Sequence, residues 1–369
     1  MDTPLPSRSP LYPLHTATGA SFALADGWEV PYAWTSPLQE TTAARQGCAL
    51  WDCSPWGRLQ ATGKDALDLL NRLTTNRLDD LHPGKGRQTV LTTPKGRCID
   101  WLWVFRLPQG LLLLTSPGAE EAVASWIDTY TITEEVSLTS LTQPMALIGV
   151  LGPGAEGLLG NALGLPPGLG WGDTWEGAGL LLLRTDALAL PQWDVLVPAQ
   201  HAPGLWQALQ SRGAVPMGEG AAELLRIAAG VPRRGKELTD AYNPLEAGLW
   251  GSVSFSKGCY VGQEVLARLK TYGKVQKALA RLTFAQPVPE GVGLWAEGKR
   301  VGLVTSSAVD DQGPIALGYL ARPYLEQGQA VEALLPEGTA VPGRVAWAPS
   351  LPPPYQALAP AQEEDEDFR

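Results

Sequence analysis

Short apolar runs alternate with helical segments and with turns that contain Gly or Pro along most of this chain. Residues 110–114 (GLLLL) precede the amphipathic segment 120–130 (EEAVASWIDTY), and residues 146–152 (ALIGVLG) precede the segment 154–164 (GAEGLLGNALG). Runs of this length fit buried strands, because a helix that crosses a bilayer needs about 20 apolar residues. Strands joined by hairpins and by single helices favour an α+β architecture over a doubly wound parallel sheet.

The pattern changes near residue 278, after which only strand-like runs remain, separated by Gly and Pro. Examples are residues 278–284 (ALARLTF), 293–309 (GLWAEGKRVGLVTSSAV) and 315–321 (IALGYLA). Many short strands without helices are typical of a small barrel or sandwich. We therefore expect a separate β domain at this end of the chain.

The chain has 369 residues and a formal net charge of -10, but its charges are unevenly distributed. Residues 349–369 are rich in Pro and Ala and end in EEDEDFR, which is typical of a disordered acidic tail. Residues 226–281 instead contain ten basic and four acidic side chains. Such a positive field suits an anionic ligand, for instance a polycarboxylate, a phosphate chain or RNA, and it equally suits a solvated basic face.

The composition, with 44% hydrophobic and 18% charged residues, excludes an intrinsically disordered chain. The N-terminus has no continuous apolar region after its first charges, so we expect a cytoplasmic protein with reduced cysteines and no membrane segment. Glycine-rich phosphate loops of the GxGxxG and GxxxxGK[ST] types are absent from the sequence. The cysteines lack the C-x-x-C spacing of structural metal sites, so we expect no metal; they are Cys48, Cys53, Cys98 and Cys259.

The segment SKGCYVGQEVLARLKTYGK combines a glycine loop with a short helix. Gly258 and Gly262 bracket Cys259, and the run from Gln263 to Leu269 has its apolar residues on one face. A thiol near a helix N-terminus and beside Lys257 is favoured as the thiolate, since both features stabilise negative charge. Cys259 is therefore the candidate reactive thiol, and the alternative is a cysteine that packs inertly beneath the loop.

These residues resemble a known family. The octapeptide KGCYVGQE (residues 257–264) is similar to the signature of the YgfZ group, within the superfamily of folate-binding proteins that includes the glycine-cleavage T-protein. Residues 225–249 (LRIAAGVPRRGKELTDAYNPLEAGL) resemble the stretch that precedes this signature, and residues 47–76 (GCALWDCSPWGRLQATGKDALDLLNRLTTN) resemble an earlier segment. The resemblance covers roughly residues 40–345.

The resemblance implies an α+β fold in which three domains form a T-protein-like ring around a channel for a tetrahydrofolate-type ligand. Two interwoven α+β domains would precede a C-terminal β-barrel. The implied boundaries are 1–55 with 145–235 for the first domain, 56–144 with 236–277 for the second, 278–348 for the barrel, and 349–369 for a disordered Pro-rich acidic tail.

The resemblance also implies a function. It indicates an accessory protein that binds tetrahydrofolate or a derivative and supports iron–sulfur cluster assembly or repair, and thereby tRNA modification. Its partners would be iron–sulfur proteins or assembly factors, with no direct DNA contact. The alternative is a folate-dependent aminomethyltransferase or methyltransferase of the T-protein type, so the resemblance leaves open whether the chain is an enzyme. A third hypothesis, an RNA-binding module, rests only on the basic stretch.

Two residues carry the implied catalytic roles, Cys259 and Asp100. The implied contacts with the cofactor are Asn76, Asp100, Lys257, Gly258, Tyr260, Gly262, Gln263 and Glu264. The residues alone also allow purely structural roles. Asp100 would then be a strand-end carboxylate bonded to the backbone of a turn, and Asn76 a helix cap or turn former.

The sequence departs from the T-protein pattern at three positions. T-proteins usually have Glu where this chain has Ala228, two adjacent acidic residues where Ile99-Asp100-Trp101 keeps only one, and Arg where it has Gln263. A carboxylate satisfies the adjacent N–H donors of a pterin ring in a bidentate way. The loss of the Glu therefore weakens the case for T-protein chemistry.

Overall fold

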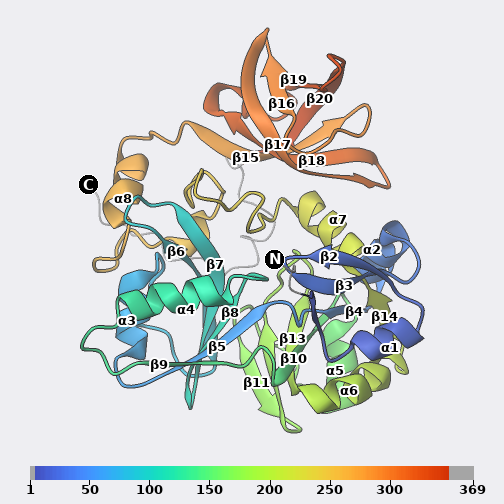
Figure 1. Ribbon diagram of the computed structural model, residues 1–369, viewed down its shortest axis with the longest axis vertical. Coiled ribbons are helices and arrows are strands. Elements are labelled where there is room, and N and C mark those ends of the chain that lie inside the picture. Colours follow the sequence, from blue (N-terminus) through green and yellow to red (C-terminus); the bar gives the residue numbers. More distant parts are fainter. Residues whose placement is uncertain (1–4, 349–369) are drawn as a thin grey trace. The chain divides into compact units, whose positions relative to one another are not determined.

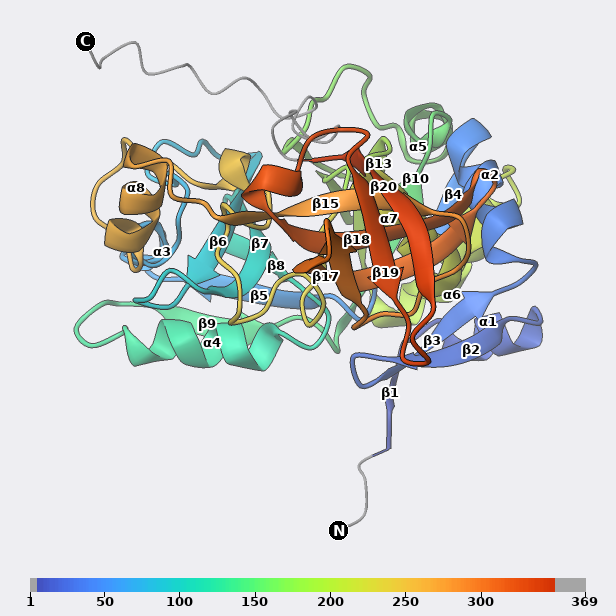
Figure 2. The same ribbon diagram turned by 90° about the horizontal axis from the view of Figure 1, so that it is seen from above.

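The computed structural model describes residues 5–348 of the chain (Figure 1; Figure 2). The predicted tail at 349–369 lies outside these residues. The chain divides into two compact units, one made of the residues up to Leu70, Leu78–Gln88 and Leu102–Glu223, the other of Asn71–Arg77, Thr89–Trp101 and the residues from Leu224 onward. The three-domain boundaries stay a prediction.

A six-stranded sheet organises the first unit. Its order is β11 (Thr174–Gly177), β12 (Leu180–Arg184), β13 (Gln192–Pro198), β10 (Met145–Leu151), β4 (Ala49–Asp52) and β14 (Val215–Met217). The pairs are antiparallel except that β14 runs parallel to β4. The helices α5 (Ala155–Leu163) and α6 (Ala202–Gln210) share one hydrophobic core with the sheet, in which Leu159, Trp193 and Trp206 are fully buried.

The N-terminal part of the first unit adds a small sheet and two helices. The sheet has the order β1 (Ser7–Arg8), β3 (Trp28–Ala33) and β2 (Ser21–Ala25), and the helices are α1 (Tyr12–Ala17) and α2 (Pro37–Gln46). Ser36 caps α2 by accepting a hydrogen bond from the Gln39 N–H. The buried Glu40 carboxylate accepts hydrogen bonds from three backbone N–H groups, those of Trp34, Thr35 and Gly218. These bonds satisfy loop donors that would otherwise be buried without a partner.

A second sheet has five strands. Its order is β6 (Lys85–Thr92), β7 (Cys98–Leu107), β8 (Gly110–Thr115), β5 (Gly57–Thr62) and β9 (Ser137–Ser140). The accompanying helices are α3 (Ala66–Leu73) and α4 (Glu120–Thr129). The helix α4 contacts β5 and buries Val123 and Ile127, which are four residues apart and share one face.

The C-terminal part of the second unit is a closed barrel. Its strands close in the order β15 (Lys277–Phe284), β18 (Gly313–Ala321), β17 (Lys299–Asp310), β16 (Gly293–Ala296), β19 (Ala330–Leu334) and β20 (Ala340–Trp347). A Cβ at Gly302 would lie 2.1 Å from the Tyr319 carbonyl oxygen, so β17 and β18 approach at a position that only glycine allows. The predicted α+β class and C-terminal β-barrel are confirmed.

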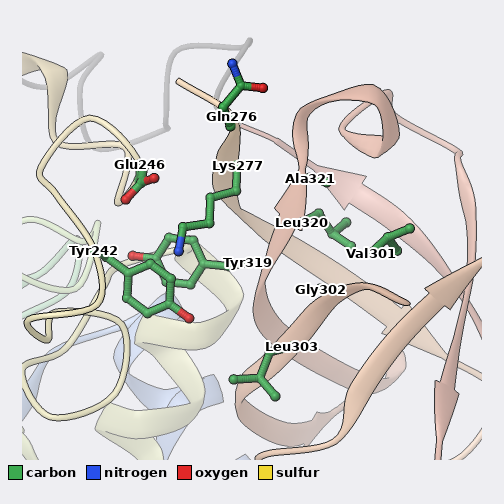
Figure 3. A pocket seen from close by; sticks show the side chains of 10 residues that line it. All are labelled: Tyr242, Glu246, Gln276, Lys277, Val301, Gly302, Leu303, Tyr319, Leu320 and Ala321. Atoms are coloured by element: carbon green, nitrogen blue, oxygen red, sulfur yellow. The ribbon is translucent and has the colours of Figure 1, made fainter. Parts of the chain in front are cut away.

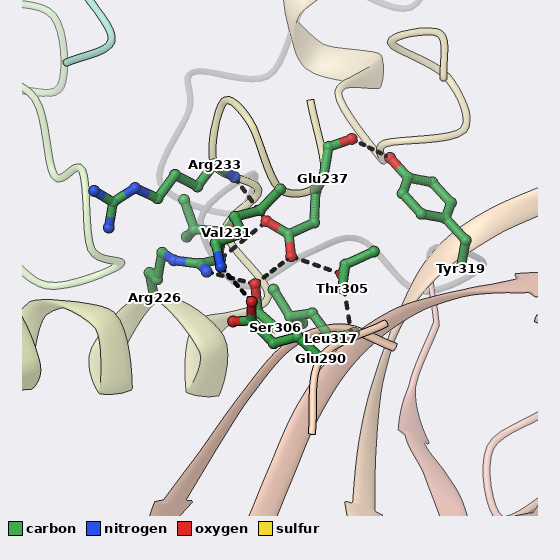
Figure 4. A network of polar contacts seen from close by, with 10 residues as sticks. Arg226, Val231, Arg233, Glu237, Glu290, Thr305, Ser306, Leu317 and Tyr319 are labelled. Atoms are coloured by element: carbon green, nitrogen blue, oxygen red, sulfur yellow. Dashed lines mark hydrogen bonds and ion pairs between the residues drawn. The ribbon is translucent and has the colours of Figure 1, made fainter. Parts of the chain in front are cut away.

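A buried ion pair links the barrel to the segment that precedes it (Figure 4). Arg226, in α7 (Glu219–Ala229), donates from Nη1 to Glu237 Oε2 at 3.0 Å and from Nη2 to Ser306 Oγ at 2.6 Å. The other Glu237 oxygen accepts from the hydroxyls of Thr305 and Ser306 at 2.7 and 2.6 Å. The Tyr319 hydroxyl donates to the Glu237 carbonyl at 2.8 Å. Both buried charges therefore have partners, since Arg226 pairs with Glu237 and each also bonds to a hydroxyl of β17.

Residues 5–348 contain no helix that is long and apolar enough to cross a membrane. The same residues include no group of three or more His, Cys, Asp and Glu side chains placed to hold a metal ion. The cytoplasmic location stays a prediction.

Candidate functional site

Lys257, the first residue of the signature octapeptide, binds the C-terminal end of α3. Its Nζ donates to the carbonyl oxygens of Asn71, Thr74 and Asn76 at 2.5, 2.8 and 2.7 Å. The last carbonyls of a helix lack partners within the helix and carry partial negative charge, so an ammonium satisfies them well. The side chain is nearly buried, with 6% of the residue exposed. The ammonium predicted to favour a Cys259 thiolate is thus engaged by the backbone.

Cys259 lies two residues beyond this contact and is exposed. The other three cysteines are buried, and burial raises the pKa of the Cys48 thiol to about 11 and that of Cys53 well above its usual range. Burial likewise raises the pKa of the Cys98 thiol. Only the thiolate is strongly nucleophilic, so these buried thiols are unreactive. Among the four cysteines, Cys259 alone is accessible to a partner or reagent.

Gly262 holds the loop close to the end of β6. Its φ is +87°, and an added Cβ would lie 2.8 Å from both Thr92 Oγ1 and the Thr93 carbonyl oxygen. The Thr92 hydroxyl donates to the Val261 carbonyl at 2.7 Å, which fixes the same approach. Gly262 is also the N-cap of α8 (Gln263–Thr271). A glycine here is therefore required by conformation and by space.

The remaining octapeptide residues divide into an anchor and an exposed helix start. Tyr260 is 7% exposed and packs with Leu245, Val253 and Leu266. Burial raises the pKa of Tyr260 to about 12. Gln263 is half-buried, and Glu264 pairs with Arg268 at 2.5 Å while both side chains remain exposed. This pair is an ordinary i,i+4 contact on a helix surface.

Asn76 joins the end of α3 to the segment before the octapeptide. Its Nδ2 donates to the Gly251 carbonyl at 3.2 Å, and its backbone carbonyl accepts from Lys257. Its Oδ1 accepts from the Arg77 N–H at 2.9 Å. Thr75 Oγ1 adds a bond to the Ser252 carbonyl at 2.6 Å. The structure thus brings Asn76 and Lys257 together, and the Asn76 side chain forms hydrogen bonds with the backbone of Gly251 and Arg77.

Asp100 lies on β7 and is fully buried. Cys98, two residues earlier, packs with Val90, Leu238 and Leu249. Side chains two apart on a strand share one face, so Asp100 lies on the same face of β7 as Cys98. Within residues 5–348, no hydrogen bond joins the two predicted catalytic residues, Cys259 and Asp100.

Ala228, which stands where T-proteins usually have Glu, is half-buried. It packs against a hydrophobic cluster that contains Ile227, Tyr242 and Tyr319, and its carbonyl accepts a hydrogen bond from Arg281. The side chain supplies only a methyl group. Asp100 keeps a buried carboxylate, and its contact with a pterin N–H donor stays a prediction.

Sequence reasoning missed the residues that hold the signature loop in place. The Thr92 hydroxyl holds the octapeptide loop through the Val261 carbonyl, and Ser254 Oγ accepts a hydrogen bond from the Lys257 N–H at 3.2 Å. Thr and Ser carry no sequence signal for such contacts, because the partners lie far apart in the chain. The one sequence signal for these contacts was Lys257, because a lysine side chain can bind the free carbonyls at the C-terminal end of a helix such as α3.

The sequence and the fold of this chain are similar to those of known proteins. Residues 11–257 match the family model described as the GCVT N-terminal domain. An aminomethyltransferase from Symbiobacterium thermophilum is 31% identical over 371 residues, which cover 95% of this chain and 98% of that protein. A putative chloroplastic transferase of Arabidopsis thaliana is 31% identical over 313 residues, covering 83% and 72%.

A solved structure shows the same fold. The crystal structure of the glycine cleavage system aminomethyltransferase T from Bartonella henselae aligns with a TM-score of 0.85 and 25% identity, over 94% of this chain and 98% of that one. The α+β architecture and the C-terminal barrel are therefore those of the T-protein fold. The chain belongs to the GCVT family, within the superfamily of the glycine-cleavage T-protein.

Proposed function

We propose that this protein is a tetrahydrofolate-binding accessory protein of the YgfZ type, which supports iron–sulfur cluster assembly or repair and thereby tRNA modification. The observation that carries the proposal is the octapeptide. It presents one exposed thiol, Cys259, on a loop whose two ends are fixed by Lys257 and Gly262. A fixed and accessible thiol is suited to contact a partner protein or the iron and sulfur atoms that the partner carries.

The folate part of the proposal rests on Asp100. A reduced folate carries one-carbon units, and the chain would hold its pterin through the buried Asp100 carboxylate. Ala228 offers no second carboxylate, and its methyl group extends the apolar cluster around Tyr242. The proposal therefore assigns the pterin contact to the carboxylate of Asp100 alone.

A second candidate function is a folate-dependent aminomethyltransferase. It is favoured by the 31% identity to the Symbiobacterium thermophilum aminomethyltransferase, which extends over nearly both full lengths. This function predicts turnover of an aminomethyl donor with tetrahydrofolate, which an Asp100→Asn variant loses. Absence of product above the background without protein excludes it.

The test of the accessory role uses a deletion strain complemented with variants of the full chain. We expect Cys259→Ala to leave an iron–sulfur enzyme that thiolates tRNA as inactive under oxidative stress as the deletion does. Thr271→Ala, a change at an exposed residue of α8, is the matched control and should complement fully. Full complementation by Cys259→Ala would overturn the role of the thiol.

Folate binding is measured separately, by titrating the intrinsic tryptophan fluorescence with tetrahydrofolate. We expect saturable quenching in the native protein and in Cys259→Ala, and at least tenfold weaker binding in Asp100→Asn, which corresponds to about 1.4 kcal/mol. Quenching that does not saturate, or equal affinity of the Asp100→Asn variant, would contradict the folate assignment and leave the thiol assignment standing.

A further inference from the structure

A cavity of about 390 Å³ lies in the second unit where β15 begins, beside β17 and β18 (Figure 3). Binding sites for small molecules have volumes of roughly 300–1,000 Å³, with mostly apolar walls and a few polar groups. Two sides of this cavity differ in chemistry. The barrel contributes aliphatic side chains together with Lys277 and Tyr319, and the segment before the barrel contributes Tyr242 and Glu246.

The aliphatic wall comes from two neighbouring strands. Leu303 of β17 lines the cavity with a half-buried side chain, and Val301 of β17 and Leu320 of β18 lie behind it in the barrel core. Figure 3 shows them on the barrel side, away from the charged groups. The stacked rings of Tyr242 and Tyr319, whose centroids are 3.5 Å apart, border the other side. These surfaces suit a branched or aromatic apolar group.

Lys277 places a cation at the edge of the cavity. Its Nζ lies 4.2 Å from the centroid of the Tyr242 ring and 3.5 Å from the Ala241 carbonyl oxygen. Across the described residues, no carboxylate lies within 4.0 Å of this ammonium. The cation is therefore held in place by a ring face and one long hydrogen bond, and its capacity to bind an anion is largely unused.

Glu246 places a carboxylate at the same edge. The side chain is 11% exposed, and its Oε2 accepts one hydrogen bond, from the Asn243 N–H at 3.1 Å. Arg97 Nη1 is 3.7 Å from the same oxygen, beyond hydrogen-bond distance. Burial raises the pKa of Glu246, against the opposing effects of the Asn243 N–H, Lys277 and Arg97. The second oxygen, Oε1, accepts no hydrogen bond from the residues between 5 and 348.

We propose that this cavity binds an α-amino acid with an apolar side chain. The ligand ammonium would donate to Glu246, its carboxylate would pair with Lys277, and its side chain would pack against the half-buried Leu303. A simple carboxylic acid would meet repulsion from Glu246, and a simple amine would meet repulsion from Lys277, so the pair selects a zwitterion. The assignment does not depend on the folate or iron–sulfur proposal.

The experiment compares three compounds that differ only in their charged groups. Calorimetric titration of the full chain with L-leucine, 4-methylpentanoate and 3-methylbutylamine separates the contributions of the ammonium and the carboxylate. We expect leucine to bind at least tenfold more tightly than either analogue. Equal binding of all three, or no binding of leucine, methionine and phenylalanine up to about 10 mM, would overturn the assignment.

Two variants assign the charges to their partners. Glu246→Gln should abolish the preference for leucine over 4-methylpentanoate, and Lys277→Met should abolish the preference for leucine over 3-methylbutylamine. The controls are Glu332→Gln and Lys299→Gln, exposed positions of the barrel outside the cavity, which should bind as the native protein does. Unchanged preferences in both site variants would refute the proposed orientation.

A third variant protects the test against loss of folding. Leu303 is half-buried, so Leu303→Trp fills the cavity with little disturbance of the barrel core. We expect this variant to lose leucine binding while its thermal unfolding midpoint stays within a few degrees of the native value. A folded Leu303→Trp variant that binds leucine with native affinity would place the ligand elsewhere.

Discussion

Replacing Lys257 by Met should destabilise the second unit, because the ammonium is the shared donor to the carbonyls of Asn71, Thr74 and Asn76. A hydrogen bond to a charged group contributes about 1.5–3 kcal/mol, and a buried acceptor left without a partner costs about 1–3 kcal/mol. The three losses are not additive, because the Met stem keeps the packing and water reaches part of the helix end. We expect a loss of about 3 kcal/mol in the free energy of unfolding.

Urea unfolding of the full chain measures this loss, and hydrogen exchange locates it. The Val261 N–H donates to the Arg72 carbonyl at 3.1 Å, so its amide should exchange faster in Lys257→Met if the loop separates from the end of α3. The matched control is Lys274→Met, an exposed lysine near the end of the same segment, with an expected change within about 0.5 kcal/mol. A loss below about 1 kcal/mol with unchanged exchange at Val261 would refute the reasoning.

Three further outcomes are expected. Gly262→Ala should destabilise the protein by about 1–3 kcal/mol in urea unfolding, because its φ of +87° and the 2.8 Å approach to Thr93 exclude a side chain. Gly258→Ala, with open space around its Cβ, should be neutral. Equal effects of the two substitutions would contradict this reasoning. Maleimide should label Cys259 alone in the native protein and all four thiols after unfolding, as counted by mass spectrometry; native labelling of a second cysteine would show that the core opens. Burial raises the pKa of Asp194 to about 6, above the roughly 3.9 of an unfolded Asp. The free energy of unfolding should therefore fall as the pH rises from about 4 to 7. Urea unfolding across this range should show a smaller decline in Asp194→Asn than in the native protein.

The class of the fold could be predicted because its signals are local. The strands of the barrel show their alternation within a few residues, and the change from mixed to strand-only patterning falls at Ala278, one residue after β15 begins at Lys277. The helix α8 begins at Gln263, as its apolar spacing and the preceding Gly262 predicted. Periodicity and turn chemistry suffice for such elements.

The site could be predicted only as a set of residues. Lys257 was expected to stabilise a thiolate at the neighbouring Cys259. Its hydrogen-bond partners are instead backbone carbonyls such as that of Thr74, which is 183 residues away in the sequence. The cavity beside Lys277 was not predicted at all, since the Tyr242 and Tyr319 rings that border it belong to different segments. Such contacts depend on how distant segments pack, which a single sequence does not record.

The buried pair of Arg226 and Glu237 also restricts how this sequence can diverge. Losing either partner alone strands a buried charge, at a cost of about 3–5 kcal/mol, whereas replacing both by apolar residues is often tolerated. Against a typical stability of about 5–15 kcal/mol, the single substitution removes a large share of the total and is therefore disfavoured. The two positions, together with the hydroxyls of Thr305 and Ser306, are therefore expected to change as one unit. The evolutionary history of strand β17 is in this way tied to that of helix α7.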